Sequence, residues 1–447
     1  MLFRSNRLYS IVNGDEYVQY PDEELQIAAT LVDSKTGNVT AQIGGRNIAD
    51  DVYLGMNRAV NTNRDFGSTV KPITDYGPLF EYKQQSTGTL IKDEPYYYEG
   101  TKTEVKNWDL TYQGTISLRR ALYDSRNVPA VKVFNEVGAD NVAKFLKKLG
   151  IQYKEIQQAN AISSNTETQD GTKYGISTEK MAAAYAAFAN GGTYNEPLYI
   201  NKIKYQDGSE QTFENEGKKA MEPYTAYMIT DILKDVITKG TGYKAQIPNL
   251  FQAGKTGTSN YTDDELAKIP HSGSISPDVM FTGYTPHYSL SIWAGYDNRM
   301  TPITTQSEGI AQDVYREMMS YASENVSNED WVMPNDVLRI GNELYVKGAS
   351  SVPVQPSYSV QGSYYNNSRY SSETTTQSSS VESETSASES STVVPPASSS
   401  EAPPSSAPDP TPTPSSSAEQ QPSQPSSSAN QPDPAQAQRN LQPSSGN

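Results

Sequence analysis

The chain has 447 residues, no cysteine, only two histidines and a formal net charge of −16 at pH 7. The lack of cysteine excludes disulfide scaffolds, thiol nucleophiles and Cys-ligated metal centres. Only His271 and His287 could serve a Ser-His-Asp triad or a multi-His metal site, and they lie on opposite sides of a strand-like stretch. Catalysis, if there is any, is therefore expected to use Ser, Lys, Asp, Glu or Tyr. The acidic balance, with no Lys/Arg-rich stripe to offset it, argues against nucleic acid as a partner.

Composition separates a tail from a globular part. Residues 371–447 are rich in Ser and Pro and hold no aromatic residue, so they cannot bury enough apolar surface to order the backbone. We therefore predict a disordered tail over residues 351–447 and one globular domain over residues 21–350. Residues 1–20 are interpreted as the remnant of an interdomain segment of a longer parent protein. No run of about 18 apolar residues is present, so no membrane span is predicted in this chain.

Strand and helix signals interleave in the globular part. Residues 25–33 and 38–44 are rich in Val, Ile, Thr and Ala and predict a β-hairpin that turns at residues 34–37. Helices are then expected at 140–150, capped by Asp140 and Gly150, and at 177–190, 224–238 and 310–322, with strands near 251–254, 280–284 and 289–294. This order predicts one mixed sheet layered with helices, not a βαβ repeat.

Three short motifs carry the chemistry: Ser68-Thr69-Val70-Lys71, Ser125-Arg126-Asn127 and Lys255-Thr256-Gly257-Thr258. Each is weak alone, because Ser-x-x-Lys recurs from Ser177 and Lys-Thr-Gly recurs from Lys35. The copy at Ser177 is interpreted as a helix cap and the copy at Lys35 as a hairpin turn.

The chosen copies differ in context. Ser68 and Lys71 lie three residues apart at a predicted helix start, where they share one face and the helix amides can stabilise an oxyanion. The motif at Lys255 follows an apolar stretch, as an inner strand that lines a cleft would, and Gly257 leaves room for a ligand backbone.

The three motifs in this order resemble those of the penicillin-binding protein and serine β-lactamase superfamily. The surrounding text, GSTVKPITDYGP, SRNVPAV, KMAAAYAAFANGGTY and AGKTGTSNYTDDE, resembles the transpeptidase half of class A penicillin-binding proteins of Gram-positive cocci over residues 10–350 and the tail. The resemblance implies a mixed α+β fold with a central, largely antiparallel sheet, helices on both faces and a helical subdomain.

The resemblance also implies roles for four residues. Ser68 is expected to attack the D-Ala–D-Ala bond of a peptidoglycan stem peptide, with Lys71 as its general base. Ser125 is expected to pass a proton to the leaving D-alanine nitrogen, and Asn127 to hold the substrate amide.

The remaining expected contacts bind substrate. Lys255, Thr256, Gly257 and Thr258 would form the site for the terminal carboxylate, and the backbone N–H groups of Ser68 and Thr258 would form the oxyanion hole. Trp108 is a further candidate as a wall of the cleft, although core packing is the favoured interpretation of this residue.

The family implies peptidoglycan donors, amine acceptors and β-lactam antibiotics as partners, a place at the extracellular face of the cell membrane or cell wall, and no metal or organic cofactor. Class A members also carry an N-terminal membrane anchor and a glycosyltransferase domain, and we expect neither within this sequence. Two alternatives stay open: a D,D-carboxypeptidase or β-lactamase-type hydrolase, and a non-catalytic module that senses β-lactams.

Overall fold

The computed structural model describes residues 8–12, 15–19, 24–46, 55–62, 64–164, 166–167 and 173–352. The chain divides into two units, Met1–Ser359 and Val360–Asn447, and every described residue belongs to the first. The predicted tail lies almost entirely outside the described residues.

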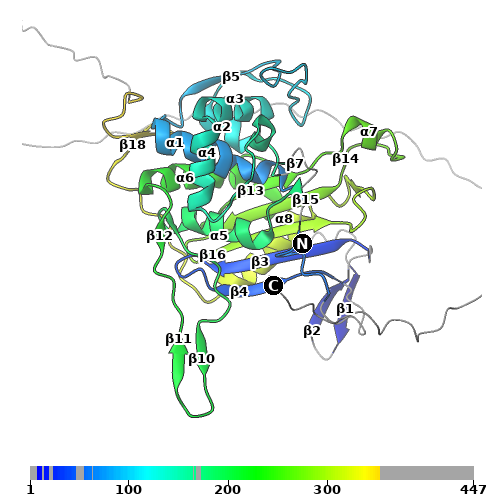
Figure 1. The fold of residues 1–447 in the computed structure, drawn as a ribbon, viewed down its shortest axis with the longest axis vertical. Helices are drawn as coiled ribbons and strands as arrows, with labels where there is room; N and C mark the ends of the chain where they lie inside the picture. The colour runs from blue at the N-terminus through cyan, green and yellow to red at the C-terminus, as the bar shows by residue number, and fades with distance from the viewer. Residues whose placement is uncertain are drawn as a thin grey trace, which may run out of the picture. The chain divides into compact units, whose positions relative to one another are not determined.

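A five-stranded antiparallel sheet forms the centre of the first unit (Figure 1). Its strand order is β13-β15-β16-β3-β4, with bounds β3 Gln26–Asp33, β4 Val39–Ile43, β13 Ala253–Thr258, β15 Asp278–Tyr284 and β16 Tyr288–Gly295. Strands β3 and β4 form the predicted hairpin, and Gly37 in its turn has the positive φ of +75° that favours glycine.

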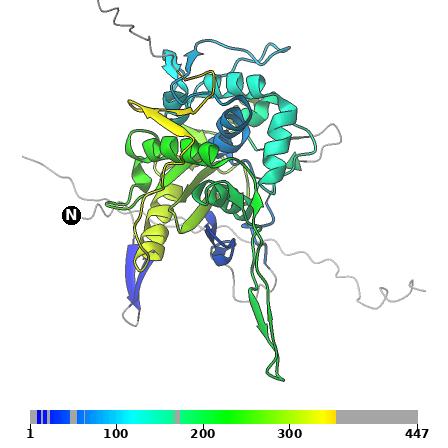
Figure 2. The ribbon, with the colours of Figure 1, turned by 90° about the vertical axis from the view of Figure 1, so that its left-hand side faces the viewer.

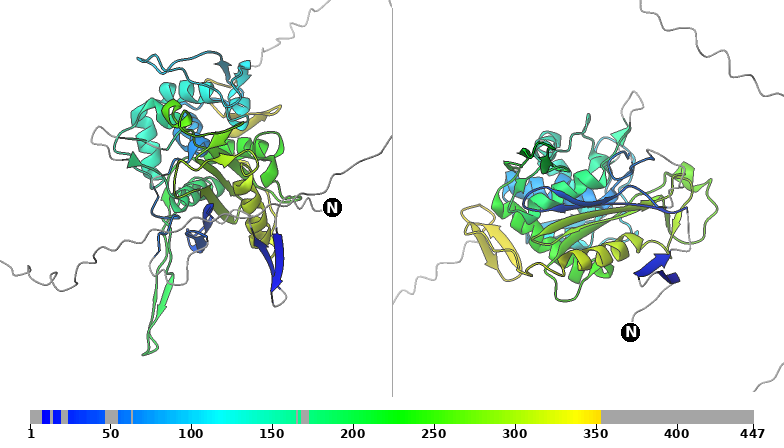
Figure 3. Two further views of the ribbon diagram at one scale, coloured as in Figure 1. Left: turned by 90° about the vertical axis from the view of Figure 1, so that its right-hand side faces the viewer. Right: turned by 90° about the horizontal axis from the view of Figure 1, so that it is seen from below.

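Side chains alternate between the two faces of this sheet. On one face, Phe281 of β15 packs against Tyr315 of α8 (Ile310–Ser323), with ring centroids 4.6 Å apart. On the other face, Tyr284 packs against Tyr185 of α5 (Thr178–Ala189), and Trp293 is buried in the same cluster. Figure 3 shows helices on both sides of the sheet. This arrangement confirms the predicted layers and the core position of Trp293.

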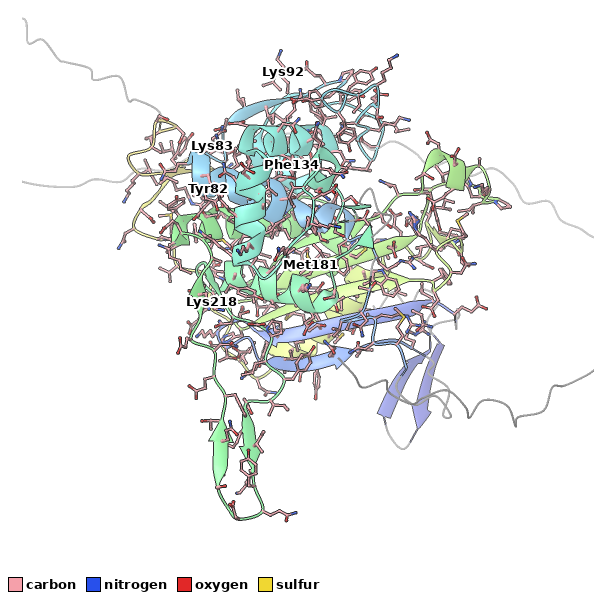
Figure 4. The ribbon with its side chains drawn as sticks, in the orientation of Figure 1. Tyr82, Lys83, Lys92, Phe134, Met181 and Lys218 are labelled. Carbon is pink, nitrogen blue, oxygen red and sulfur yellow. The ribbon has the colours of Figure 1, made fainter. Side chains whose placement is uncertain are left out.

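A helical layer lies beyond the α5 face. It comprises α1 Gly77–Lys83, α2 Leu118–Tyr123, α3 Asn127–Val137, α4 Ala139–Lys148 and α6 Pro223–Thr238. Figure 4 labels Tyr82 on α1 and Phe134 on α3, and Tyr82 meets Phe145 of α4 edge to face at 6.4 Å between ring centroids. The apolar side chains of these helices form one continuous buried cluster with the sheet.

Smaller elements surround these layers. Their bounds are β1 Leu8–Val12, β2 Asp15–Gln19, β5 Leu90–Asp93, β6 Gly114–Ser117, η3 Gln158–Ala161, β7 Thr166–Glu167, β8 Lys173–Tyr174, β9 Thr193–Tyr194, β10 Lys202–Lys204, β11 Glu210–Thr212, β12 Lys218–Lys219, η4 Tyr243–Ala245, α7 Asp263–Leu266, β14 Ile275–Ser276, β17 Ile303–Thr304, β18 Val337–Ile340 and β19 Glu343–Val346. The hairpin of β10 and β11 projects away from the sheet (Figure 2). Within the described residues, none of the helices combines the length and the apolar composition needed to cross a membrane.

The predicted helix caps had different outcomes. Ser177 is the N-cap of α5, and its side chain accepts a hydrogen bond from the Lys180 amide, which confirms the prediction. The prediction that Asp140 caps α4 is wrong, because Gly138 occupies the N-cap position and Asp140 lies within the first turn. Gly138 has a φ of +82°, which lets the chain turn directly from α3 into α4 and starts α4 before Asp140.

A buried arginine joins three elements of the fold. Arg119 of α2 donates to Asp235 at 2.9 Å, to Asp231 at 2.7 Å and to Glu343 at 3.1 Å. Because these partners come from α6 and β19, the cluster fixes the helical layer to the C-terminal strand pair.

We predict that Arg119→Ala lowers the free energy of unfolding by about 3–5 kcal/mol, because it leaves carboxylates without their buried counter-charge. Denaturant titration measures this loss. Lys202→Ala is the matched control: it removes the half-exposed Lys202–Glu210 ion pair and should change stability by less than about 0.5 kcal/mol. Equal effects of the two variants would contradict the prediction.

Candidate active site

The turn that carries Ser68 begins with a glycine in the left-handed region of backbone conformation. Gly67 has a φ of +47°, and a Cβ at this position would lie 2.3 Å from the Thr258 carbonyl oxygen. Only glycine allows the backbone to approach β13 so closely. Ser68 is therefore held next to the strand that carries the Lys255 motif.

This segment is not the regular helix that the sequence predicted. Residues Gly67–Val70 form a 3₁₀ turn (η1), Pro72–Tyr76 form a π turn (η2), and the α-helix α1 starts only at Gly77. The segment starts with a tight 3₁₀ turn because Gly67 lies against β13. Pro72, which has no N–H to donate, occupies the first position of the π-helical turn.

Hydrogen bonds to Tyr185 and Asp65 hold the turn in place. The Tyr185 hydroxyl of α5 donates to the Thr69 carbonyl at 2.6 Å. The Asp65 carboxylate accepts from the Gly67 amide at 2.8 Å and from the Ser164 amide at 2.8 Å. Burial raises the pKa of Asp65, and these hydrogen bonds oppose the rise. The position of Ser68 therefore depends on residues from three separate parts of the chain.

Lys71 is fully buried and directed at the second motif. Its Nζ donates to the Ser125 carbonyl at 2.7 Å and to Asn127 Oδ1 at 2.7 Å, and lies 3.2 Å from Ser125 Oγ. Among the described residues, its hydrogen bonds go to Ser125 and Asn127 and not to Ser68, the partner that helix spacing indicated. The two shortest bonds use both N–H groups of a neutral amine, so its lone pair remains available to accept a proton.

Lys255 approaches the same hydroxyl from the sheet. Its Nζ donates to Ser125 Oγ at 2.8 Å, and the side chain is fully buried. The prediction that the Lys255 motif lies on an inner strand is wrong, because β13 is an edge strand of the five-stranded sheet. A sheet edge leaves one side of the motif strand open toward η1 and the pocket, whereas an inner strand would be paired on both sides.

The two lysines share a site of low polarity. Burial lowers the pKa of Lys71 from 10.5 to about 7, with Asp75 opposing and Arg126 reinforcing the shift. Burial also lowers the pKa of Lys255, and the neighbouring Lys71 lowers it further. Near neutral pH, Lys71 is thus present in part as a free amine that can remove a proton from a hydroxyl.

The second motif lies in a turn between α2 and α3. Ser125 has a φ of +55°, in the left-handed region that non-glycine residues rarely adopt. This backbone conformation brings the Ser125 carbonyl to Lys71. Asn127 starts α3, and its Nδ2 donates to the Lys106 carbonyl at 2.8 Å. Both the Ser125 carbonyl and Asn127 Oδ1 then face Lys71.

The three motifs converge on a pocket of about 700 Å³. Of the residues predicted for the site, it is lined by Ser68, Trp108, Ser125, Asn127, Thr256, Gly257 and Thr258. Lys71 and Lys255 meet at Ser125 beside it. Gly257 is needed here because a Cβ would lie 2.5 Å from the Phe66 carbonyl oxygen, so the close approach is to η1.

The structure contradicts the favoured interpretation of Trp108 as a core residue. It is 64% exposed and lines the pocket, and its Nε1 donates to the Asp124 carbonyl at 3.1 Å. Core packing was therefore the wrong choice. A short loop holds the indole on the surface, and the sequence pattern around Trp108 carried no sign of this.

A known protein family matches the part of the chain that builds this site. The family described as penicillin binding protein transpeptidase domain matches residues 27–320, a range that contains all three motifs. The chain belongs to the penicillin-binding protein transpeptidase family. This membership confirms the resemblance stated from the motifs and the assignment of the chain as a transpeptidase-type enzyme.

Relatives of this transpeptidase domain are class A penicillin-binding proteins. The chain is 53% identical over 352 residues to penicillin-binding protein 1A of Streptococcus pneumoniae, covering 78% of this chain and 49% of the relative. It is 55% identical over 329 residues to the protein of the same name from Streptococcus oralis, covering 73% of this chain and 52% of the relative. The chain thus spans about half the length of the curated relatives it matches.

Solved structures share the fold. Penicillin-binding protein 1A from Haemophilus influenzae superposes with a TM-score of 0.61 at 19% identity, covering 76% of this chain and 56% of that chain. PonA1 from Mycobacterium tuberculosis gives 0.60 at 20% identity, covering 75% and 86%. The predicted β-lactamase and transpeptidase-like fold class is confirmed.

Sequence reasoning missed the support beneath the transpeptidase site. Arg126 is fully buried and donates to Asp93 at 2.8 Å and to Asp109 at 2.7 Å. A cation two residues before the apolar run Val128–Val131 was the available signal, because a charge in such a place needs a buried partner. The partners themselves, 33 and 17 residues away along the chain, had no local signal.

We predict that Tyr185→Phe destabilises the domain by about 1–3 kcal/mol, because it removes the buried hydroxyl that donates to the Thr69 carbonyl. Urea unfolding measures the change. Tyr321→Phe, which removes the hydroxyl of a tyrosine that is 78% exposed, is the control and should be neutral. A neutral Tyr185→Phe would show that the Ser68 turn does not depend on this bond.

Proposed function

We propose that this domain is a D,D-transpeptidase that acts through a Ser68 acyl-enzyme. The observation that carries the proposal is the convergence of two buried lysines on Ser125 Oγ, at 3.2 and 2.8 Å, beside a pocket lined by Ser68. Acyl transfer through serine requires a base with a lowered pKa and fixed donors for the substrate. In this proposal Lys71 is the base, and Ser125, Asn127 and Lys255 are the donors.

In the proposed acylation step, Ser68 Oγ attacks the carbonyl carbon of the D-Ala–D-Ala peptide bond, and its proton passes to Lys71 Nζ. The backbone N–H groups of Ser68 and Thr258 stabilise the oxyanion. Collapse of the tetrahedral intermediate breaks the C–N bond, and the leaving D-alanine nitrogen takes a proton through Ser125. The product is a Ser68 ester.

The second step uses an acceptor amine of a neighbouring stem peptide. Its nitrogen attacks the ester carbonyl, Ser68 regains its proton through Lys71, and a new peptide bond cross-links the two strands. Asn127 and Trp108 hold the acyl part of the donor, and Lys255, Thr256, Gly257 and Thr258 form the site for its terminal carboxylate. That carboxylate supplies the anionic partner which Lys255 lacks among the described residues.

We infer that β-lactams acylate the same serine, because their lactam carbonyl mimics the scissile amide. Relatives are named penicillin-binding proteins, and PonA1 has been solved in complex with penicillin V. We further propose residues 21–350 as the transpeptidase domain, residues 1–20 as a preceding interdomain segment and residues 351–447 as a tail. The natural place of such a domain is the outer face of the membrane, where peptidoglycan is assembled.

Mass spectrometry with labelled penicillin tests the nucleophile. We predict a stable adduct on Ser68 and none with Ser68→Ala, whereas Ser320→Ala, which changes a partly buried serine of α8, leaves the adduct unchanged. A D-Ala–D-Ala-like thioester offered with an acceptor amine then separates the alternatives. Aminolysis supports transpeptidation, rapid loss of the adduct indicates a hydrolase, and an adduct without thioester turnover indicates a sensor.

The pH dependence of acylation tests the base. Because burial lowers the pKa of Lys71 to about 7, the protonated, inactive form dominates below that pH. The second-order rate of penicillin acylation should therefore rise with pH and level off above about pH 8. A rate that keeps rising to about pH 10 would match an unshifted lysine and contradict the proposed role.

A further inference from the structure

Two large apolar side chains stand exposed where the loop 106–113 borders the pocket. Trp108 is 64% exposed and Leu110 is 75% exposed, and both line the pocket with Ser125 and Asn127. Single exposed leucines are common on protein surfaces. The backbone at Leu110, however, is not ordinary.

Leu110 has a φ of +56°, in the left-handed region. A residue with a branched side chain is strained in this region, and glycine would occupy the position without that strain. The side chain at position 110 therefore strains the backbone and gains no stabilising burial in return. A protein keeps such a residue at a pocket when the side chain has a use there.

The surrounding bonds impose this conformation. The Leu110 amide donates to the Asn107 carbonyl at 3.0 Å, and the Thr111 amide donates to Asp109 Oδ1 at 3.0 Å. Arg126 binds Asp109 at 2.7 Å and also contacts the Thr111 carbonyl. The buried guanidinium of Arg126 thus holds the turn at residues 107–111, and Leu110 of this turn lines the pocket.

Two further hydrogen bonds tie the loop to one end of the site. Asn107 Oδ1 accepts from the Asn127 amide at 2.8 Å, and Asn127 Nδ2 donates to the Lys106 carbonyl at 2.8 Å. In the proposed function, Asn127 holds the acyl part of the donor, whereas β13 binds its carboxylate end. The loop therefore borders the acyl side of the bond that is broken.

We propose that Leu110, together with Trp108, is a specificity-determining residue that binds apolar groups on the acyl side of the donor. Such groups include the methylene chain of a stem-peptide side chain and the aromatic acyl substituent of a penicillin. Their burial against leucine and indole supplies the binding free energy. The inference rests on the proposed Ser68 acyl-enzyme.

The test compares two acylating agents that share the same lactam. Penicillin V carries a phenoxymethyl acyl substituent, and 6-aminopenicillanic acid carries none. In Leu110→Gly and Leu110→Ser, the second-order acylation rate with penicillin V should fall about three- to tenfold, the loss expected when roughly half of a leucine side chain no longer becomes buried. The rate with 6-aminopenicillanic acid should change by less than about twofold.

Leu90→Ser is the matched control, since Leu90 is 68% exposed on β5 and does not line the pocket. It should leave both rates unchanged. The melting temperature separates binding from folding: Leu110→Gly should melt at the same temperature as the parent or slightly higher, because glycine relieves the strain at this φ.

Two results would overturn the inference: equal slowing with both reagents, which would mean that Leu110 acts on the catalytic geometry, or unchanged rates with both. Failure of the proposed function looks different. In that case the unmodified protein would form no Ser68 adduct with either reagent.

Discussion

The hydroxyl of Ser125 is the point on which the site depends. It lies 2.8 Å from Lys255 Nζ and 3.2 Å from Lys71 Nζ, although these residues are 130 and 54 positions away in the chain. Two amines that are buried around one hydroxyl cannot both remain fully charged, because burial outweighs the attraction between Lys71 and the carboxylate of Asp75. Burial lowers the pKa of Lys71, and burial together with the neighbouring Lys71 lowers the pKa of Lys255.

A site of this kind needs a rigid frame, because misplaced buried charges are costly. Arg126 provides part of that frame. Its guanidinium binds Asp93 and Asp109 beneath the second motif, while Asn107 accepts from the Asn127 amide. Burial alone would raise the pKa of Asp109, but its hydrogen bonds to Arg126 and Thr111 lower it to about 2. One buried ion-pair cluster therefore positions both the polar groups that face Lys71 and the loop at the edge of the pocket.

Local patterns predicted much of the fold. The hairpin of β3 and β4, the helices α5, α6 and α8, and the strands β15 and β16 were expected near their observed positions, because alternation and helical periodicity depend on neighbours in the sequence. The start of α4 and the form of the Ser68 segment were not. Gly67 bends the chain because it contacts the Thr258 backbone, a contact that no pattern near residue 67 reveals.

The sequence by itself determined which chemical groups are available and in what order: a serine and two lysines, a second serine with an asparagine, and glycines where the backbone must pass closely. It thereby determined the family and the expected chemistry. Only the tertiary structure decided that the Lys255 strand lies at the sheet edge, that Trp108 is exposed, that Ser125 and Leu110 take positive φ values, and that Lys71 points at Ser125. These features depend on contacts between distant segments, and on the loss of water around them, which residue order alone does not specify.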